Sequence, residues 1–169
     1  MPRATVPLLV LLLLASPAAA QSKAAPCSEP GYHQWDFWLG SWRVTAPDGK
    51  PQGTNRVVRA PAGCAFEEHW TGLKGVGGDS FNVYDPVRKT WTQLWGGAGG
   101  VIRLEGRLDA KGAMRLEGSA ANWPAREAHP IRGTWTPMPG GVVRQEFDEQ
   151  DPRTKAWSTT FVGIYRKAG

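Results

Sequence analysis

The sequence predicts an all-β fold, an antiparallel barrel of about ten strands. Glycine (21 residues) and proline (14 residues) make up about a fifth of the 169-residue chain. This disfavours a helical bundle, because both residues are costly inside helices. Short runs with strand-like alternation recur about every ten to fourteen residues, separated by turn signals such as Pro47–Lys50. Sequential strands joined by short turns favour an antiparallel meander, which we expect to close because closure removes exposed sheet edges.

The strand pattern occurs in ten ranges: 41–46, 53–60, 64–72, 80–84, 90–95, 101–108, 113–120, 131–136, 142–147 and 156–166. The fifth range shows the alternation well, since Trp91, Gln93 and Trp95 share one face of a strand. No apolar pattern persists long enough to predict a long helix. A two-sheet sandwich has similar strand spacing and stays open as the competing architecture.

The amino terminus has the pattern of a secretory signal peptide. Arg3 precedes an apolar stretch at 6–15, and Ser16–Ala20 forms a small-residue cleavage site. A membrane anchor is the alternative, but about ten apolar residues are too few to cross a bilayer core of roughly 30 Å. We expect a periplasmic or secreted protein that does not stay at the membrane after cleavage. The chain then divides into a signal peptide (1–20), a loose arm (21–31) and one barrel domain (32–169).

Composition and charge exclude several classes of protein. A hydrophobic fraction of 41% with 21% charged residues is incompatible with disorder of the whole chain. The net charge of +5 is mild, and basic and acidic residues are interleaved without a basic block. We therefore expect no nucleic-acid partner.

Cys27 and Cys64 are the only cysteines, and export favours their pairing in a disulfide. The bridge would connect the amino-terminal arm to the turn at 60–64. A free buried thiol or a pair of metal ligands are the alternatives. Neither cysteine has a neighbour at metal-ligand spacing, which argues against zinc.

The stretch Trp35–Val44 carries a resemblance to known barrels. Trp35, Trp38 and Trp42 have the spacing of a short helical turn that leads into the first strand. Gly40-Ser41-Trp42 resembles the G-x-W start of lipocalins and related calycins. That resemblance implies a short helix that closes one barrel end, with Trp38, Gly40 and Trp42 in structural roles. It also implies that an arginine near the end of the last strand, here Arg166, covers Trp42.

A longer series of motifs is similar to a bacterial domain-of-unknown-function family of secreted proteins whose members begin F-D-F-W-x-G-x-W. The matching segments are 36–42, 63–70, 84–95 and 157–166. Trp35 stands where the family motif begins with Phe. The resemblance implies a calycin-like barrel of about ten strands with a short amino-terminal helical plug. It brings no established activity and no catalytic residues.

The candidate site comes from strand alternation. Glu68 shares a strand face with Phe66 and Trp70, so an inward orientation would bury its charge and require a partner. The candidate partners are Arg103, Arg115 and Arg144. The predicted ligand-binding residues are Glu68, Trp70, Trp91, Gln93, Trp95 and Arg144. They would hold a small, largely apolar or aromatic molecule in the barrel lumen. The open alternative is that the tryptophans simply fill a closed core.

Two other functions are weighed against ligand binding. A hydrolase or isomerase would use Glu68 or His69 as general base, whereas a protein-interaction module would need a contiguous exposed apolar patch. Glu146 and Asp148 share a strand face at a separation that paired catalytic carboxylates would accept, but a solvated face beside Arg144 is the favoured explanation. We expect no metal site and no cofactor. In haem-binding barrels of this size the axial histidine lies near the last strands, and the segment 156–169 has no histidine.

Overall fold

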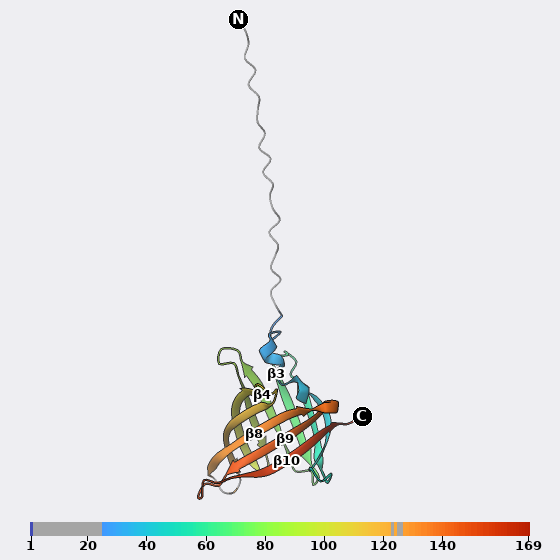
Figure 1. Cartoon of the computed structure of the whole chain (residues 1–169), viewed down its shortest axis with the longest axis vertical. Helices are drawn as coiled ribbons and strands as arrows, with labels where there is room; N and C mark the ends of the chain where they lie inside the picture. Colours follow the sequence, from blue (N-terminus) through green and yellow to red (C-terminus); the bar gives the residue numbers. More distant parts are fainter. Residues whose placement is uncertain (2–24, 123, 125–126) are drawn as a thin grey trace.

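Ten antiparallel strands form one closed barrel in the computed structural model, which describes Met1, residues 25–122, Pro124 and residues 127–169 (Figure 1). Each strand pairs with the next along the chain, and the first pairs with the last. The strands are β1 (Gly40–Thr45), β2 (Pro51–Arg59), β3 (Ala65–Gly72), β4 (Gly77–Asp85), β5 (Thr90–Gly97), β6 (Gly100–Leu108), β7 (Met114–Asn122), β8 (Ala128–Met138), β9 (Val142–Gln150) and β10 (Trp157–Lys167). The all-β barrel is therefore confirmed, and the pairing of β1 with β10 excludes an open sandwich.

The predicted signal peptide at 1–20 lies outside the described residues, apart from Met1. Among the residues that the structure describes, no helix is long and apolar enough to span a membrane.

Within the described residues, three short 3-10 helices accompany the strands: η1 (Pro30–His33), η2 (Asp36–Trp38) and η3 (Pro139–Gly141). The first two lie together at one end of the barrel (Figure 1). Gly40 follows with φ of 133°, a backbone conformation that side-chain-bearing residues rarely adopt. This glycine lets the chain turn from η2 directly into β1.

The predicted disulfide between Cys27 and Cys64 is confirmed. It joins the segment before η1 to the turn between β2 and β3. A disulfide of this kind indicates an oxidising compartment. The described part of the arm is thus covalently fixed beside one end of the barrel.

Aromatic side chains fill the barrel at the end where η1 and η2 lie. Trp35 and Trp38 are fully buried and stack with ring centroids 5.3 Å apart. Trp35 also contacts Trp135 at 4.9 Å and Trp91 at 5.7 Å, both edge to face. Edge-to-face and offset contacts of this kind suit the quadrupoles of aromatic rings. The cluster connects the segment before β1 to the strands β5 and β8.

Lys167, rather than Arg166, covers Trp42. The Lys167 Nζ atom lies 3.7 Å from the centre of the Trp42 ring. In the β1–β10 pairing Trp42 lies opposite Lys167, whereas Arg166 lies opposite Arg43 on the outer face. The expectation for Arg166 is corrected by one residue, because adjacent side chains of a strand point to opposite faces. Desolvation beside the ring lowers the pKa of Lys167.

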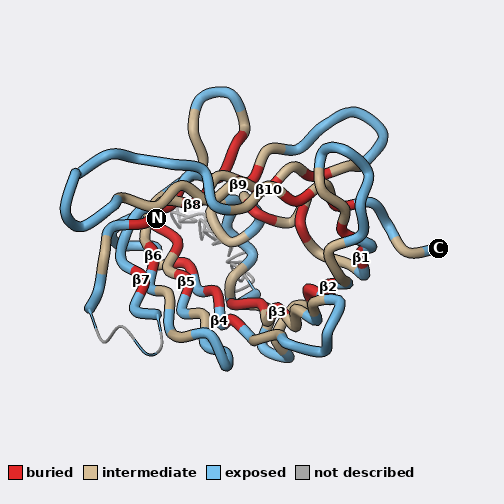
Figure 2. Tube along the Cα trace, turned by 90° about the horizontal axis from the view of Figure 1, so that it is seen from below, coloured by how far each residue is buried: buried red, intermediate tan, exposed pale blue. Residues whose placement is uncertain are grey.

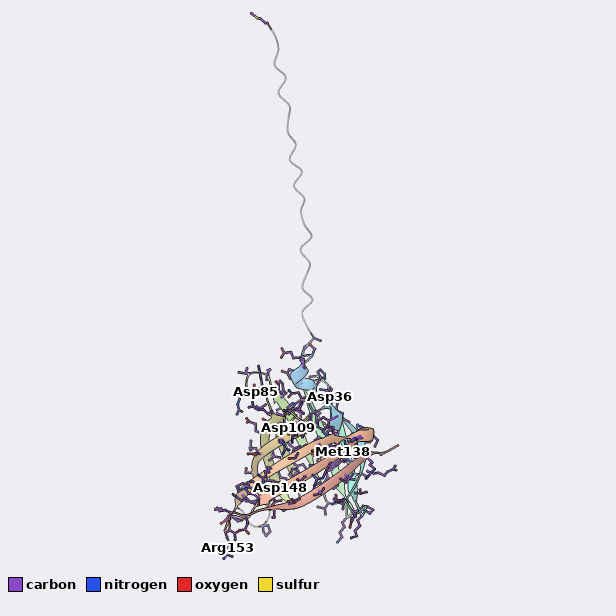
Figure 3. All side chains as sticks on the ribbon, in the orientation of Figure 1. Asp36, Asp85, Asp109, Met138, Asp148 and Arg153 are labelled. Atoms are coloured by element: carbon purple, nitrogen blue, oxygen red, sulfur yellow. A yellow bond between two sulfur atoms is a disulfide. The ribbon has the colours of Figure 1, made fainter. Side chains whose placement is uncertain are left out.

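The two barrel ends differ in what they carry. Asp36 of η2 and Asp85 at the end of β4 lie at the end that holds the aromatic cluster, and Arg153 after β9 lies at the opposite end (Figure 3). Viewed from that opposite end, the strands form a ring in which buried and exposed positions alternate (Figure 2). The second end contains the site described next.

Candidate functional site

A cavity of about 240 Å³ occupies the half of the lumen away from η1 and η2. This volume lies between the roughly 150 Å³ of a cavity that binds benzene and the roughly 300 Å³ at which ligand pockets usually begin. Its lining consists of Glu68, Trp70, Gln93, Trp95, Ile102, Ile131, Gln145, Phe147, Glu149, Thr160, Phe161 and Tyr165. The structure therefore places Glu68, Trp70, Gln93 and Trp95 around one cavity, as the strand alternation of β3 and β5 predicted.

Glu68 is 5% exposed and accepts hydrogen bonds on both carboxylate oxygens. Asn55 donates from Nδ2 to Oε1 at 2.7 Å, and the Ser80 hydroxyl donates to Oε2, also at 2.7 Å. The Asn55 partner comes from β2 and the Ser80 partner from β4, the two strands that flank β3. The carboxyl group is thus held from both sides at a fixed position on the lumen wall.

A second row of donors supports Ser80. Asn82 donates from Nδ2 to the Ser80 oxygen at 2.8 Å, and Gln93 donates from Nε2 to the Asn82 oxygen at 2.9 Å. Because the Ser80 oxygen accepts from Asn82, its own hydrogen is free to point at Glu68. In this series of hydrogen bonds each donor points toward the Glu68 carboxyl group, and this arrangement stabilises negative charge there.

The expected arginine partner of Glu68 is absent among the described residues. Arg144 lies on the outer face of β9, where it pairs with Glu146. Arg115 pairs with Asp109 at 2.6 Å, and Arg103 is exposed on β6. Arg144 is therefore removed from the set of residues around the cavity. Neutral hydrogen-bond donors contact Glu68, whereas the sequence analysis expected a positively charged arginine.

Burial is the main influence on the acidity of Glu68, and it raises the pKa of this carboxyl group from 4.5 to about 7. The hydrogen bonds from Ser80 and Asn55 oppose this shift, because they favour the ionised form. Asp79 raises the pKa slightly further and His69 lowers it, both through space from the outer face. Glu68 consequently changes charge near neutral pH.

Aromatic rings form one side of the cavity and connect it to the core cluster. Trp70 meets Phe161 edge to face at 6.2 Å, and Phe161 meets Phe147 at 6.1 Å. Phe147 in turn lies 5.6 Å from Trp135, which belongs to the cluster around Trp35. The predicted wall residue Trp91 lies in that cluster, fully buried against Phe66 and Tyr84, and does not line the cavity.

Glu149, the second carboxyl group that lines the cavity, already has hydrogen-bonding partners. Glu149 lies 2.6 Å from His129 Nε2 and accepts a hydrogen bond from Thr160 at 2.9 Å. A register shift in the β9–β10 pairing between Thr159 and Phe161 lets the adjacent residues Thr160 and Phe161 both line the cavity. Tyr165, deeper in the barrel, donates to Gln145 Oε1. Burial raises the pKa of Tyr165 well above 10, so its hydroxyl stays protonated.

His69, the other candidate general base, lies on the outer face of β3. Its Nδ1 atom is 2.7 Å from Asp79, and its side chain is 42% exposed. Glu68 and His69 are neighbours in one strand and so lie on opposite sides of the barrel wall. They do not act on one bound molecule.

Sequence reasoning missed most of the polar framework. Asn55, Ser80 and Asn82 on β2 and β4 and Gln145 and Tyr165 on β9 and β10 were not singled out. The signal was present in the alternation of β4, where Ser80, Asn82 and Tyr84 share a face. It was also present in β9, where Gln145, Phe147 and Glu149 do. The sequence did not show that these faces of β4 and β9 line the same lumen as Glu68.

The outer wall carries apolar side chains of its own. Phe81, Val83, Leu94 and Val101 on β4, β5 and β6 are each 40–49% exposed. Phe81 and Leu94 are direct cross-strand neighbours. Monomeric proteins commonly expose a patch of this kind, so it does not by itself favour a protein-interaction module. In the described part of the chain no three His, Cys, Asp or Glu side chains come together in a way that could hold a metal ion.

Comparison with known proteins adds no functional assignment. No protein-family model matches the sequence, and no curated protein is significantly similar to it.

Proposed function

We propose that this protein binds a small, largely apolar or aromatic molecule in the barrel lumen. The single observation that carries the proposal is the cavity of about 240 Å³ between Trp70, Trp95 and Phe161. Ligand pockets typically combine a mostly apolar wall with a few fixed polar groups. Here Glu68, Gln93 and Gln145 supply the polar groups from three different strands. The cavity size suits a molecule of one or two rings.

We further propose a calycin-like architecture for this barrel. The 3-10 helices before β1 and the rings of Trp35 and Trp38 would serve as the plug of one end, and the ligand would enter from the other. The resemblance to the secreted family with the F-D-F-W-x-G-x-W motif supports this assignment. The signal-peptide pattern and the disulfide support a periplasmic or secreted location.

The matched pair Ile102→Trp and Val101→Trp tests the binding proposal. Ile102 lines the cavity, so a tryptophan there fills it, whereas the adjacent Val101 lies on the outer face of the same strand. Native mass spectrometry of the exported protein is expected to show a co-purifying small molecule in the wild type and in Val101→Trp, but not in Ile102→Trp. If all three proteins carry the same molecule, it does not occupy the lumen and the proposal fails.

A general-base role for Glu68 is the second candidate. The observation that favours it is a buried carboxyl group on a cavity wall with a pKa near 7, which is the range of efficient acid–base catalysts. This role predicts that the co-purified molecule or its close analogues are chemically changed by the wild type and not by Glu68→Gln. Unchanged analogues after long incubation with the wild type would leave binding as the function.

A further inference from the structure

We propose that the ligand of this cavity is a small organic cation, a protonated amine on an aromatic or apolar body, whose ammonium group meets Glu68. This inference rests on the proposed binding function and names the chemical class of its ligand. It follows from the charges that line the cavity, the direction of the hydrogen bonds at Glu68 and the aromatic wall beside it.

The first argument is charge. Glu68 and Glu149 both line the cavity, and no lysine, arginine or histidine does so among the described residues. Glu149 is paired with His129, but Glu68 has only neutral partners. A buried carboxylate without a counter-charge is costly, and a bound cation would supply that charge.

The second argument is hydrogen-bonding capacity. A carboxylate accepts about four hydrogen bonds, and Glu68 receives one on each oxygen, so one site on each oxygen remains. Glu68 therefore offers acceptor sites to the cavity that lack donors. An ammonium group provides up to three N–H donors and no acceptor, which matches this need.

The third argument is the surrounding surface. Trp70, Trp95, Phe147 and Phe161 line the same cavity as Glu68. Aromatic faces attract cations through their quadrupole, and they also pack against the apolar body of an amine. An anionic ligand would meet two carboxyl groups and no described cation, and a neutral apolar ligand would leave the acceptors at Glu68 unused.

Three ligands of one shape but different charge test the inference: 2-phenylethylamine, 2-phenylethanol and phenylacetate. Binding is measured by isothermal titration calorimetry on the disulfide-intact protein at neutral pH. We expect the amine to bind at least about tenfold more tightly than the alcohol, and the acid to bind most weakly. Ile102→Trp should abolish the binding of the amine, because it fills the lumen.

The matched variants Glu68→Gln and Glu67→Gln locate the cation. Glu67 is the neighbour of Glu68 on the outer face of β3 and does not line this cavity. Glu68→Gln is expected to reduce the affinity for the amine by about tenfold or more and to leave the alcohol nearly unchanged, whereas Glu67→Gln should alter neither. Amine preference that survives in Glu68→Gln overturns the assignment to Glu68.

The wild-type measurements separate failure of this inference from failure of the binding function. Equal affinity for the three ligands, or preference for phenylacetate, overturns the cation inference while the lumen remains a binding site. If none of the three binds to the wild type, the cavity does not admit molecules of this size, and both proposals fail.

Discussion

Titration of Glu68 should make the stability of the native barrel depend on pH in a specific direction. Burial raises the pKa of this carboxyl group from 4.5 to about 7, so the native state binds its proton more tightly than the unfolded chain. The proton therefore stabilises the native state. Its contribution is fully present below about pH 4.5 and is lost as the pH rises through about 7. The pKa difference corresponds to about 3 kcal/mol of unfolding free energy.

The substitution Glu68→Gln removes this titration and keeps the size of the side chain. The variant has no carboxyl group to titrate at this position. We therefore expect the difference in unfolding free energy between wild type and variant to change with pH. The amide has one accepting oxygen in place of two, so it cannot accept from both Asn55 and Ser80, and this should cost the variant about 1 kcal/mol at every pH. At about pH 8 the variant should therefore be more stable than the wild type by about 2 kcal/mol.

Urea unfolding of the ligand-free proteins between about pH 5 and about pH 8, at constant ionic strength, measures this difference. All other titrating groups are shared by the two proteins and cancel. Glu67→Gln serves as the control, since its side chain is 43% exposed and it should retain the wild-type slope. A constant difference between wild type and Glu68→Gln across the range would refute the reasoning, because Glu68 would then titrate alike in the native and unfolded states.

Two further predictions concern stability. Replacing Cys27 and Cys64 together by serine should lower the unfolding free energy by about 4 kcal/mol, since the bridge closes a loop with a sequence separation of 37. Urea unfolding with and without a thiol reductant measures this, and the reasoning fails if reduction leaves the wild type unchanged. Lys167→Gln should cost about 1 kcal/mol through loss of the contact with Trp42, whereas Arg166→Gln should be nearly neutral. Equal effects of these two variants in the same assay would contradict the one-residue correction on β10.

Local patterns predicted much of the fold. Ten alternating runs with turn signals between them correspond to the ten strands, because side chains alternate with a period of two wherever one face is buried. The prediction of the Cys27–Cys64 bridge needed only the export pattern and the absence of other cysteines. It could also be predicted that Glu68 and Trp70 share a strand face, since this depends on one strand alone.

The composition of the site was only partly predictable. The alternation of β9 places Arg144 on the face opposite Gln145, so the sequence contained the signal against its role in the lumen. The sequence analysis nevertheless assigned Arg144 to the lumen, because a buried Glu68 was expected to need a positively charged partner. The partners that the structure provides are neutral side chains, Asn55 and Ser80. Their contact with Glu68 depends on how β2, β3 and β4 align, and a single strand does not reveal that alignment.

The class of fold, the expected disulfide and the strand face that Glu68 shares with Trp70 follow from the sequence, because each depends on local alternation or on counting residues. The register of the strand pairs, and which face of β3 points into the lumen, follow only from the three-dimensional structure. Register places Lys167 rather than Arg166 over Trp42, and the shift in β10 brings Thr160 and Phe161 to one cavity. A slip of one residue in pairing exchanges the two faces of a strand. The identity of the lumen wall is therefore a property of the closed barrel as a whole.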